Sequence, residues 1–316
     1  MSVALVFPGQ GSQSVGMLAD LAAAQPRVVA DTFAEASAAL GYDLWQLVCT
    51  GPAERLNATE CTQPAMLAAG IATWRCWQAL GGPTPQLVSG HSLGEFTALV
   101  CAGALDFAAA VELVRFRGQA MQQAVPAGTG AMAAVLGLDD AEVEAACAEG
   151  AQGEVVEAVN YNSPGQIVIA GHSTAVERAI AAARARGAKR AVALPVSVPS
   201  HSSLMRGAAE RLRERLATLT VRRPAIRYVS AVDAAEHAEP ADVVAILVRQ
   251  LASPVRWSAT VAALTARGAS CLIECGPGKV LTALNRRIDR RPEIQCLALE
   301  DSASLGAAVA AAKGAA

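Results

Sequence analysis

The sequence lacks the features that mark nucleic-acid-binding and metal-binding proteins. Its 316 residues carry 26 Lys and Arg against 28 Asp and Glu, so the formal net charge is −2 and no basic footprint for nucleic acid exists. The eight cysteines form no C-x-x-C pair, and the four histidines are dispersed without a ligand spacing. We therefore expect no metal site and no nucleic-acid partner, and we interpret the cysteines as reduced core residues.

Targeting and membrane signals are missing as well. Residues 1–7 contain no basic segment and are followed by Pro8 and Gly9, unlike a secretory signal peptide. No apolar run is long enough to span a bilayer without a charge, a Gly or a Pro. We expect a cytoplasmic protein that has no membrane partner.

Aromatic residues make up only 4% of the chain, whereas hydrophobic residues together make up 53%, with Ala and Val abundant. This composition is typical of an α/β protein, in which Ala-rich helices cover a buried and mostly parallel sheet. A chain of 316 residues exceeds what one compact core usually needs. We therefore expect a large and a small domain.

The small domain is predicted from the order of elements between residues 127 and 196. Apolar runs and turn residues there indicate the order β-α-β-β-α-β, which is the ferredoxin-like split βαβ unit. The predicted strands are 131–136, 155–161, 166–170 and 191–196, and the predicted helices are 139–149 and 173–186. We expect residues 1–126 and 197–316 to form the large domain, into which residues 127–196 are inserted.

Two further predictions concern the longest helix and the end of the chain. Residues 63–66, which begin with Gln63, open an Ala-rich helix that we expect to run to about Leu80, where a Gly-Gly-Pro sequence ends it. The Ala- and Gly-rich tail after Gly306 is the only segment that we expect to lack structure.

The main functional signal is the motif Gly-His-Ser-Leu-Gly at residues 90–94, with Ser92 at its centre. It follows a short predicted strand, and a helical pattern begins directly after it. This is the arrangement of a nucleophile elbow, in which a sharp turn exposes the serine hydroxyl and backbone N–H groups at the helix N-terminus meet an oxyanion. The alternative is an ordinary Gly-rich turn between a strand and a helix.

A second Gly-rich loop, residues 8–13, follows the first predicted strand at residues 3–7. It lacks the Lys-Ser/Thr pair of a P-loop and the spacing of a dinucleotide-binding fingerprint, so phosphate binding is disfavoured. We interpret the loop either as backbone that approaches a reacting atom or as a plain turn, and its residues alone favour neither.

Arg117 is the most informative charged residue. It lies on the predicted helix 107–124 in an apolar stripe with Leu113 and Val114, whereas Arg115 lies on the polar side. A guanidinium on a buried face needs an anion, because it keeps its proton. The alternatives are a structural salt bridge to an internal carboxylate and a bidentate clamp for a substrate carboxylate.

His201 is the preferred base for Ser92. It lies on the loop by which the chain re-enters the large domain, and pockets often form at such junctions. Of the carboxylates between the two residues, only Asp106 occupies a suitable loop, so an acid that completes a triad is not evident. A missing acid fits a thioester substrate, because a thiolate leaves far more readily than an amine or an alkoxide.

These motifs resemble those of the malonyl-CoA:acyl carrier protein transacylases of fatty acid synthesis and, more broadly, of the acyltransferase domains of polyketide synthases. The resemblance covers nearly the whole chain and rests on residues 7–13, 90–95, 115–118, 160–166, 199–201 and 276–281. It implies an acyltransferase with an α/β-hydrolase-like core, a mostly parallel sheet and an inserted ferredoxin-like subdomain.

The resemblance also implies roles for individual residues. Ser92 is implied to be the acylated nucleophile and His201 its base. The backbone N–H groups of Gln10 and Leu93 are implied to form the oxyanion hole. The main-chain carbonyl of Gln250 is implied to orient His201 in place of a carboxylate.

The substrate and the partner follow from the same resemblance. Arg117 is implied to bind the free carboxylate of a malonyl group, which passes from malonyl-CoA to Ser92 and then to the phosphopantetheine thiol of an acyl carrier protein. No cofactor of its own is implied, and we expect a monomer. Basic residues that either contact the acidic carrier or are merely solvated helix ends are Arg184, Arg186, Lys189, Arg190, Arg286, Arg287, Arg290 and Arg291.

Three alternatives stay open. A serine hydrolase, such as a thioesterase, explains the elbow but leaves Arg117 without a role. A transacylase that serves a polyketide or malonate-decarboxylating system shares the chemistry and differs in its carrier. A carrier-docking module without catalysis is disfavoured, because Ser92, His201 and Arg117 are all present.

Overall fold

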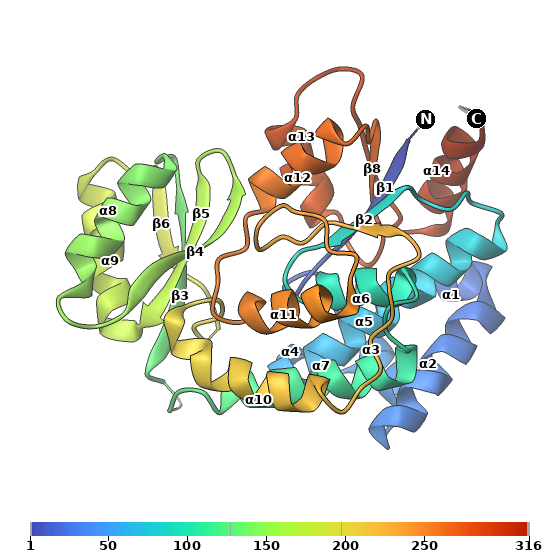
Figure 1. The fold of residues 1–316 in the computed structure, drawn as a ribbon, viewed down its shortest axis with the longest axis horizontal. Coiled ribbons are helices and arrows are strands. Elements are labelled where there is room, and N and C mark those ends of the chain that lie inside the picture. Colours follow the sequence, from blue (N-terminus) through green and yellow to red (C-terminus); the bar gives the residue numbers. More distant parts are fainter. Residues whose placement is uncertain (1, 127, 197, 315–316) are drawn as a thin grey trace.

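The computed structural model describes residues 2–126, 128–196 and 198–314, and within these ranges it contains two sheets (Figure 1). Sheet A has five strands in the order β7-β2-β1-β8-β9, and all its strand pairs are parallel. Its strands are β1 (Val3–Phe7), β2 (Leu87–Gly90), β7 (Arg227–Tyr228), β8 (Cys271–Glu274) and β9 (Gln295–Ala298). The prediction of an α/β protein with a mostly parallel main sheet is therefore confirmed.

Strand β1 lies at the centre of sheet A, and its side chains pack into two separate hydrophobic clusters. Leu5 and Phe7 belong to one cluster, whereas Ala4 and Val6 belong to another. Successive side chains of a strand point to opposite faces of its sheet, so the two clusters lie on the two faces. All five residues of β1 are buried because both faces are covered, as is usual for parallel sheets.

Helices pack around sheet A on both sides (Figure 1). They are α1 (Ala19–Ala24), α2 (Pro26–Leu40), α3 (Leu44–Thr50), α4 (Ala53–Asn57), α5 (Thr59–Ala79), α6 (Gly94–Cys101), α7 (Phe107–Gln122), α10 (Arg206–Leu216), α11 (Pro240–Gln250), α12 (Trp257–Ala266), α13 (Val280–Ile288) and α14 (Ser302–Gly314). No helix in the described part of the chain has the length and apolar character needed to cross a membrane.

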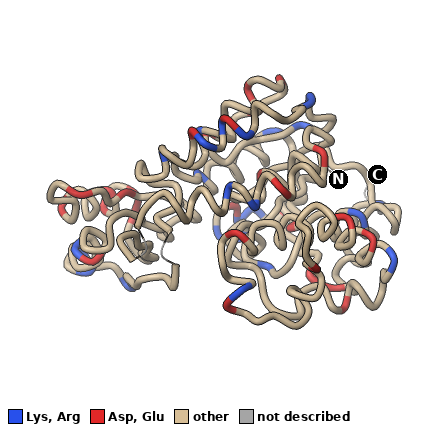
Figure 2. The backbone as a smooth tube through the Cα atoms, turned by 90° about the horizontal axis from the view of Figure 1, so that it is seen from below, with Lys and Arg blue, Asp and Glu red and all other residues tan. Residues whose placement is uncertain are grey.

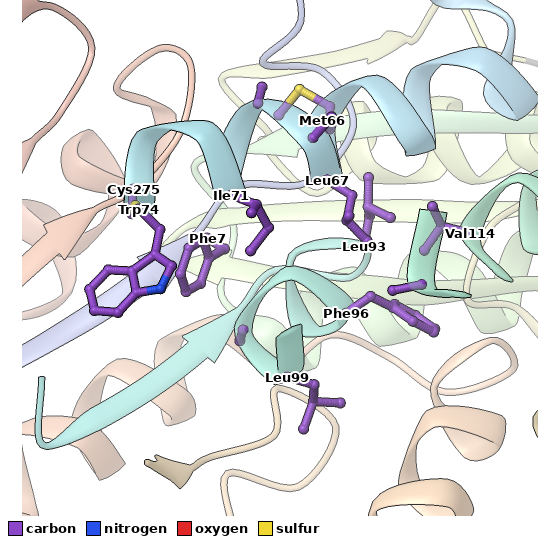
Figure 3. Packing of buried hydrophobic residues seen from close by; sticks show 14 of the residues in the cluster. Phe7, Met66, Leu67, Ile71, Trp74, Leu93, Phe96, Leu99, Val114 and Cys275 are labelled. Carbon is purple, nitrogen blue, oxygen red and sulfur yellow. The ribbon is translucent and has the colours of Figure 1, made fainter. Parts of the chain in front are cut away.

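Helix α5 packs against the elbow region. Leu67 of this helix lies beside Leu93, the residue before α6, and Ile71 lies beside Phe7 of β1 (Figure 3). The prediction that α5 begins at Gln63 is wrong, because the helix already begins at Thr59 and includes Pro64. The proline removes only one backbone hydrogen bond near the start of the helix, and burial of most of its 21 residues offsets that loss.

Sheet B has four antiparallel strands in the order β4-β5-β3-β6 and forms the left part of the molecule in Figure 1. Its elements are β3 (Gly130–Leu136), α8 (Asp140–Ala151), β4 (Val156–Ser163), β5 (Gln166–His172), α9 (Ser173–Ala185) and β6 (Arg190–Ala193). This element order and strand order are those of the predicted ferredoxin-like unit. The expected domain boundaries fall at residues 127 and 197, which lie outside the described residues, so the division into 1–126, 127–196 and 197–316 stays a prediction.

Sheet B is tied to the rest of the chain through strand β4. The backbone N–H of Val255, in the loop before α12, donates to the carbonyl of Val159 at 2.8 Å. The N–H of Tyr161 donates to the carbonyl of Val255 at 2.9 Å. These two bonds extend the pairing of β4 by one bridge and join this edge strand of sheet B to the loop before α12.

The tail after Gly306 was expected to lack structure, and this prediction is wrong for the described residues. Helix α14 runs from Ser302 to Gly314. Leu305, Ala308 and Ala312 of this helix are buried against the main hydrophobic cluster. Their spacing of three and four residues forms one helical face, which the low complexity of the Ala-rich sequence obscured.

Candidate active site

The elbow lies where β2 ends and α6 begins, and its backbone is strained at Ser92. Ser92 has a φ of 52°, in the left-handed region that residues other than glycine seldom adopt. Such strain persists only where the surrounding structure enforces it, and it is concentrated at functional sites. The geometry is that of a nucleophile elbow, which favours this interpretation over an ordinary Gly-rich turn.

The two glycines of the elbow are required by close backbone contacts. A Cβ atom on Gly90 would lie 1.9 Å from the carbonyl carbon of Gly94. A Cβ atom on Gly94 would lie 2.0 Å from the carbonyl oxygen of Phe7. The elbow therefore folds back on itself and packs directly on the carboxyl end of the central strand, which only glycine allows.

Ser92 and His201 are brought together from positions 109 residues apart. The Ser92 hydroxyl and His201 Nε2 are 2.7 Å apart, and His201 Nδ1 is 2.9 Å from the main-chain carbonyl of Gln250. A carbonyl oxygen only accepts hydrogen bonds, so Nδ1 carries the proton and Nε2 accepts from the serine. Asp106, the one carboxylate considered for the triad, instead accepts from the backbone N–H of Ala109 and caps α7.

The protonation state of His201 follows from its surroundings. Its side chain is 4% exposed, and burial together with the nearby Arg117 cation lowers its pKa from 6.5 to about 3. Hydrogen bonds to the backbone carbonyl of Gln250 oppose this shift only in part. The imidazole is therefore neutral near pH 7 and is able to take the proton of Ser92.

Arg117 is buried beside Ser92 and has neutral partners. Its Nη2 donates to Ser92 Oγ at 3.2 Å and to Gln250 Oε1 at 2.9 Å, and its Nη1 donates to Gln63 Oε1 at 2.9 Å. Its Nε has no hydrogen-bond partner among the described residues. Burial lowers the pKa of Arg117 to about 10, so the guanidinium remains charged near neutral pH.

The sequence left two explanations for Arg117, and the structure separates them. None of the salt bridges among the described residues includes Arg117, so an internal carboxylate does not pair with it directly. A buried cation held by amides and a hydroxyl, with one N–H unpaired, retains capacity for an external anion. This arrangement favours the substrate-carboxylate clamp over the structural salt bridge.

Sequence reasoning missed the side chains of Gln63 and Gln250. Both are buried, and both present an amide oxygen to Arg117. Gln250 was considered only for its main-chain carbonyl, and Gln63 only as a helix start. A polar amide within an apolar helical run is a weak signal by itself, because its partner comes from a distant segment.

Gln10 and Leu93 lie in the same cavity as Ser92, His201 and Arg117. The cavity has a volume of about 680 Å³, and its wall includes Met132, Asn160 and Val168 of sheet B together with loops and helices that surround sheet A. The backbone N–H groups of Gln10 and Leu93 donate to no other described residue. Unpaired N–H groups beside a nucleophile are suited to an oxyanion, and the loop 8–13 therefore approaches the reacting centre, one of its two predicted interpretations.

The remaining histidines have other partners. His91 Nε2 lies 2.9 Å from Asn162 Oδ1, and burial lowers the pKa of His91. His172 Nδ1 accepts from the backbone N–H of Val155, and His237 Nε2 pairs with Asp233. Within the described ranges, no group of three or more His, Cys, Asp or Glu side chains is arranged to hold a metal ion.

The eight basic residues expected either to contact the carrier or to be solvated differ in whether they form ion pairs. Arg186 forms ion pairs with Glu142 and Glu149, and Arg291 forms one with Asp289. Positively and negatively charged residues both occur over the whole molecule, as Figure 2 shows. The other six of these basic residues form no ion pair within the described part of the chain: Arg184, Lys189, Arg190, Arg286, Arg287 and Arg290.

Comparison with known proteins identifies the family. The acyl transferase domain family matches residues 4–299. The malonyl CoA-acyl carrier protein transacylase of Salmonella typhimurium is 56% identical over 306 residues, covering 97% of this chain and 98% of that protein. These matches confirm the resemblance predicted from the sequence motifs.

Solved structures agree with this result. The malonyl CoA-acyl carrier protein transacylase of Coxiella burnetii has a TM-score of 0.96 and 50% identity, covering 98% of this chain and 97% of that one. A malonyl-transacylase solved in complex with its type II polyketide-synthase acyl-carrier protein has a TM-score of 0.96 and 53% identity, covering 98% and 100%. The chain belongs to the acyl transferase domain family.

Proposed function

We propose that the chain is an acyl-carrier-protein S-malonyltransferase of fatty acid biosynthesis. It transfers the malonyl group of malonyl-CoA to the phosphopantetheine thiol of an acyl carrier protein through a malonyl ester of Ser92. The observation that carries this proposal is a buried Arg117 whose Nη2 lies 3.2 Å from the Ser92 hydroxyl and which has no carboxylate partner within the described chain.

The first half-reaction acylates Ser92. His201 Nε2 takes the hydroxyl proton while Oγ bonds to the thioester carbonyl carbon, which gives a tetrahedral oxyanion. The C–S bond then breaks, and the proton on His201 passes to the departing CoA sulfur. A thiolate is a good leaving group, so the main-chain carbonyl of Gln250 is sufficient to orient the imidazole.

The second half-reaction reverses these steps with a different thiol. His201 takes the proton of the carrier's phosphopantetheine thiol, the sulfur bonds to the ester carbonyl carbon, and the C–Oγ bond breaks. The proton returns to Ser92, so the enzyme is regenerated without a net proton change. Both half-reactions pass through an oxyanion, which the N–H groups of Gln10 and Leu93 stabilise.

Arg117 selects the acyl group. Its fork binds the free carboxylate of the malonyl ester, and an acyl group without a carboxylate leaves the buried cation unpaired. Unpaired buried charge is costly, so acetyl groups are bound less well than malonyl groups. The same contact holds the ester away from water, which favours transfer over hydrolysis.

The partner supplies the only prosthetic group in this proposal, because phosphopantetheine arrives on the carrier. A relative of 53% identity has been solved with its acyl-carrier protein, which supports binding of such a partner here. Arg184 and Arg286 donate to backbone carbonyls, and Arg186 and Arg291 form ion pairs. The cations proposed to meet the acidic carrier are therefore Lys189, Arg190, Arg287 and Arg290. We further propose that the enzyme acts as a cytoplasmic monomer, with residues 127–196 as a separate small domain.

One experiment tests this proposal directly. The protein is mixed with malonyl-CoA, with acetyl-CoA or with neither, and the intact mass is measured before and after addition of the carrier. We expect a malonyl adduct that forms on Ser92, persists in water and disappears when the carrier thiol is added. A short-lived adduct that water removes would indicate a hydrolase, and no adduct would indicate a docking module.

A second candidate carrier follows from the polyketide-synthase complex of that relative. The chemistry at Ser92 is the same, and only the protein that accepts the malonyl group differs. Comparing kcat/KM for a fatty-acid-type and a polyketide-type carrier separates the two pathways, because the preferred carrier shows the higher value.

A further inference from the structure

Glu95 is a buried carboxylate that the mechanism above does not use. It lies on α6, three residues after Ser92, and its side chain is fully buried. Its Oε2 accepts a hydrogen bond from the hydroxyl of Tyr228, and its Oε1 accepts one from Gln250 Nε2 at 2.8 Å. Buried carboxylates are rare unless they are paired, and the hydrogen-bond partners of Glu95 are two neutral side chains. The position of this carboxylate therefore requires an explanation.

The contact with Glu95 sets the orientation of the Gln250 amide. Gln250 Nε2 donates to Glu95 Oε1 and to the main-chain carbonyl of Ser92 at 2.9 Å. With both amide protons used, the amide oxygen is left facing Arg117 Nη2 at 2.9 Å. If the amide were reversed, its NH₂ group would face the Arg117 guanidinium, and its oxygen would face the oxygens of Glu95 and Ser92.

Gln250 therefore links two parts of the site. Its side chain holds Arg117, while its main-chain carbonyl holds His201 Nδ1 at 2.9 Å. Glu95 contacts the opposite end of the Gln250 side-chain amide, its Nε2. Burial raises the pKa of Glu95, and the hydrogen bonds from Tyr228 and Gln250 act against this shift. The ionised form of Glu95 favours the charged form of Arg117, although the two side chains are not in direct contact.

We infer that Glu95 is a positioning residue for acyl selection, which holds Arg117 through the Gln250 amide and leaves the guanidinium free for the substrate carboxylate. This inference rests on the proposed function of Arg117. A carboxylate bound directly to Arg117 would occupy the donors that the malonyl group needs. A carboxylate placed one residue further away compensates the buried cation without competing with the substrate.

The test compares acylation of Ser92 by malonyl-CoA and by acetyl-CoA in Glu95→Gln. We expect the malonyl-to-acetyl ratio of kcat/KM to fall about tenfold, the size typical of coupling between neighbouring groups. In the Arg117→Ala background the same substitution should leave the ratio unchanged, because Glu95 then has nothing to position. An equal loss with both substrates, or a loss that persists without Arg117, would overturn the inference.

Glu274→Gln is the matched control. Glu274 is also fully buried, and its carboxylate accepts from the backbone N–H groups of Leu281 and Thr282 at the start of α13. We expect this variant to lower the stability of the protein without changing the malonyl-to-acetyl ratio. A change in the ratio of the same size as in Glu95→Gln would mean that loss of any buried carboxylate alters selection, and it would overturn the inference.

Tyr228→Phe keeps the inference testable if Glu95→Gln does not fold. It removes one donor to Glu95 and leaves the carboxylate and Gln250 in place, so we expect a fall in the ratio of about threefold. A folded Tyr228→Phe protein with an unchanged ratio would overturn the inference. Arg117→Ala by itself tests the proposed function: if this variant keeps its preference for malonyl, the clamp fails, whereas failure of Glu95→Gln alone leaves the clamp intact.

Discussion

The two sheets differ in what is buried around them. Around sheet A, the buried side chains include the charged or polar groups of Glu95, Arg117, His201 and Gln250. The buried polar side chains on the strands of sheet B are the neutral Asn162 and Ser163 of β4, and the cluster between this sheet and its two helices is hydrophobic. The parallel sheet therefore carries the strained and charged chemistry, while the antiparallel unit contributes packing and one wall of the cavity.

The first prediction removes the nucleophile at the end of sheet A. Ser92→Ala should abolish the malonyl adduct and lower kcat/KM by about 10⁴-fold or more, because no other group attacks the thioester. Intact mass and transfer kinetics measure both effects. Ser89→Ala is the matched control: its hydroxyl is buried on β2, three residues before Ser92, without a hydrogen-bond partner among the described residues, and its removal should leave the adduct intact.

The second prediction removes the buried cation. Arg117→Ala should lower kcat/KM for malonyl-CoA by about 10²-fold, as expected for loss of a buried charge pair with the substrate, and should shift the preference toward acetyl-CoA. Competition between the two thioesters measures the shift. Arg115→Ala, on the same helix, should change neither value, because Arg115 bonds to the carbonyl of Leu40 outside the cavity.

The third prediction concerns sheet B. Ile169→Ala should lower the free energy of unfolding by about 3 kcal/mol, because it leaves a cavity among buried residues. The malonyl-to-acetyl ratio should stay unchanged. Denaturant unfolding and kinetics on the same samples check both expectations. A lost preference for malonyl in Ile169→Ala would contradict the division of roles between the sheets, and Val168→Ala, which faces the cavity instead, provides the comparison.

The fourth prediction is that the acylation rate does not depend on pH near neutrality. Because burial and the Arg117 cation lower the pKa of His201 to about 3, the acylation rate should stay level between pH 8 and pH 5. The unfolded chain binds a proton on this residue below pH 6.5 and the folded chain does not. This contribution to stability is therefore present above pH 6.5 and is lost as the pH falls toward 3. An acid limb near pH 6.5 in single-turnover acylation would show that His201 is solvated.

The sequence predicted those features that depend on local pattern. The elbow motif places Ser92 at a strand-to-helix turn, and the apolar stripe of α7 marks Arg117 as buried. The order of strands and helices between residues 127 and 196 predicts the antiparallel unit. Each of these signals lies within one segment, so spacing and periodicity are enough to detect it.

Features that depend on contacts between distant segments were not predictable in this way. The amides of Gln63 and Gln250 meet Arg117 only after three helices have packed together. The sequence pattern does not reveal the start of α5 at Thr59, because a proline inside a helix is locally unfavourable and only tertiary burial outweighs the cost of Pro64. Helix α14 was missed because its apolar face consists mostly of alanine, which resembles low-complexity sequence.

The end of helix α11 at Gln250 has an electrostatic consequence. The last carbonyl groups of a helix lack intrahelical partners and carry the negative end of its macrodipole, roughly half an elementary charge. The carbonyl that faces His201 Nδ1 is one of these groups. It therefore stabilises the imidazolium that forms during each half-reaction, and since it belongs to the main chain, substitution of the Gln250 side chain does not delete it.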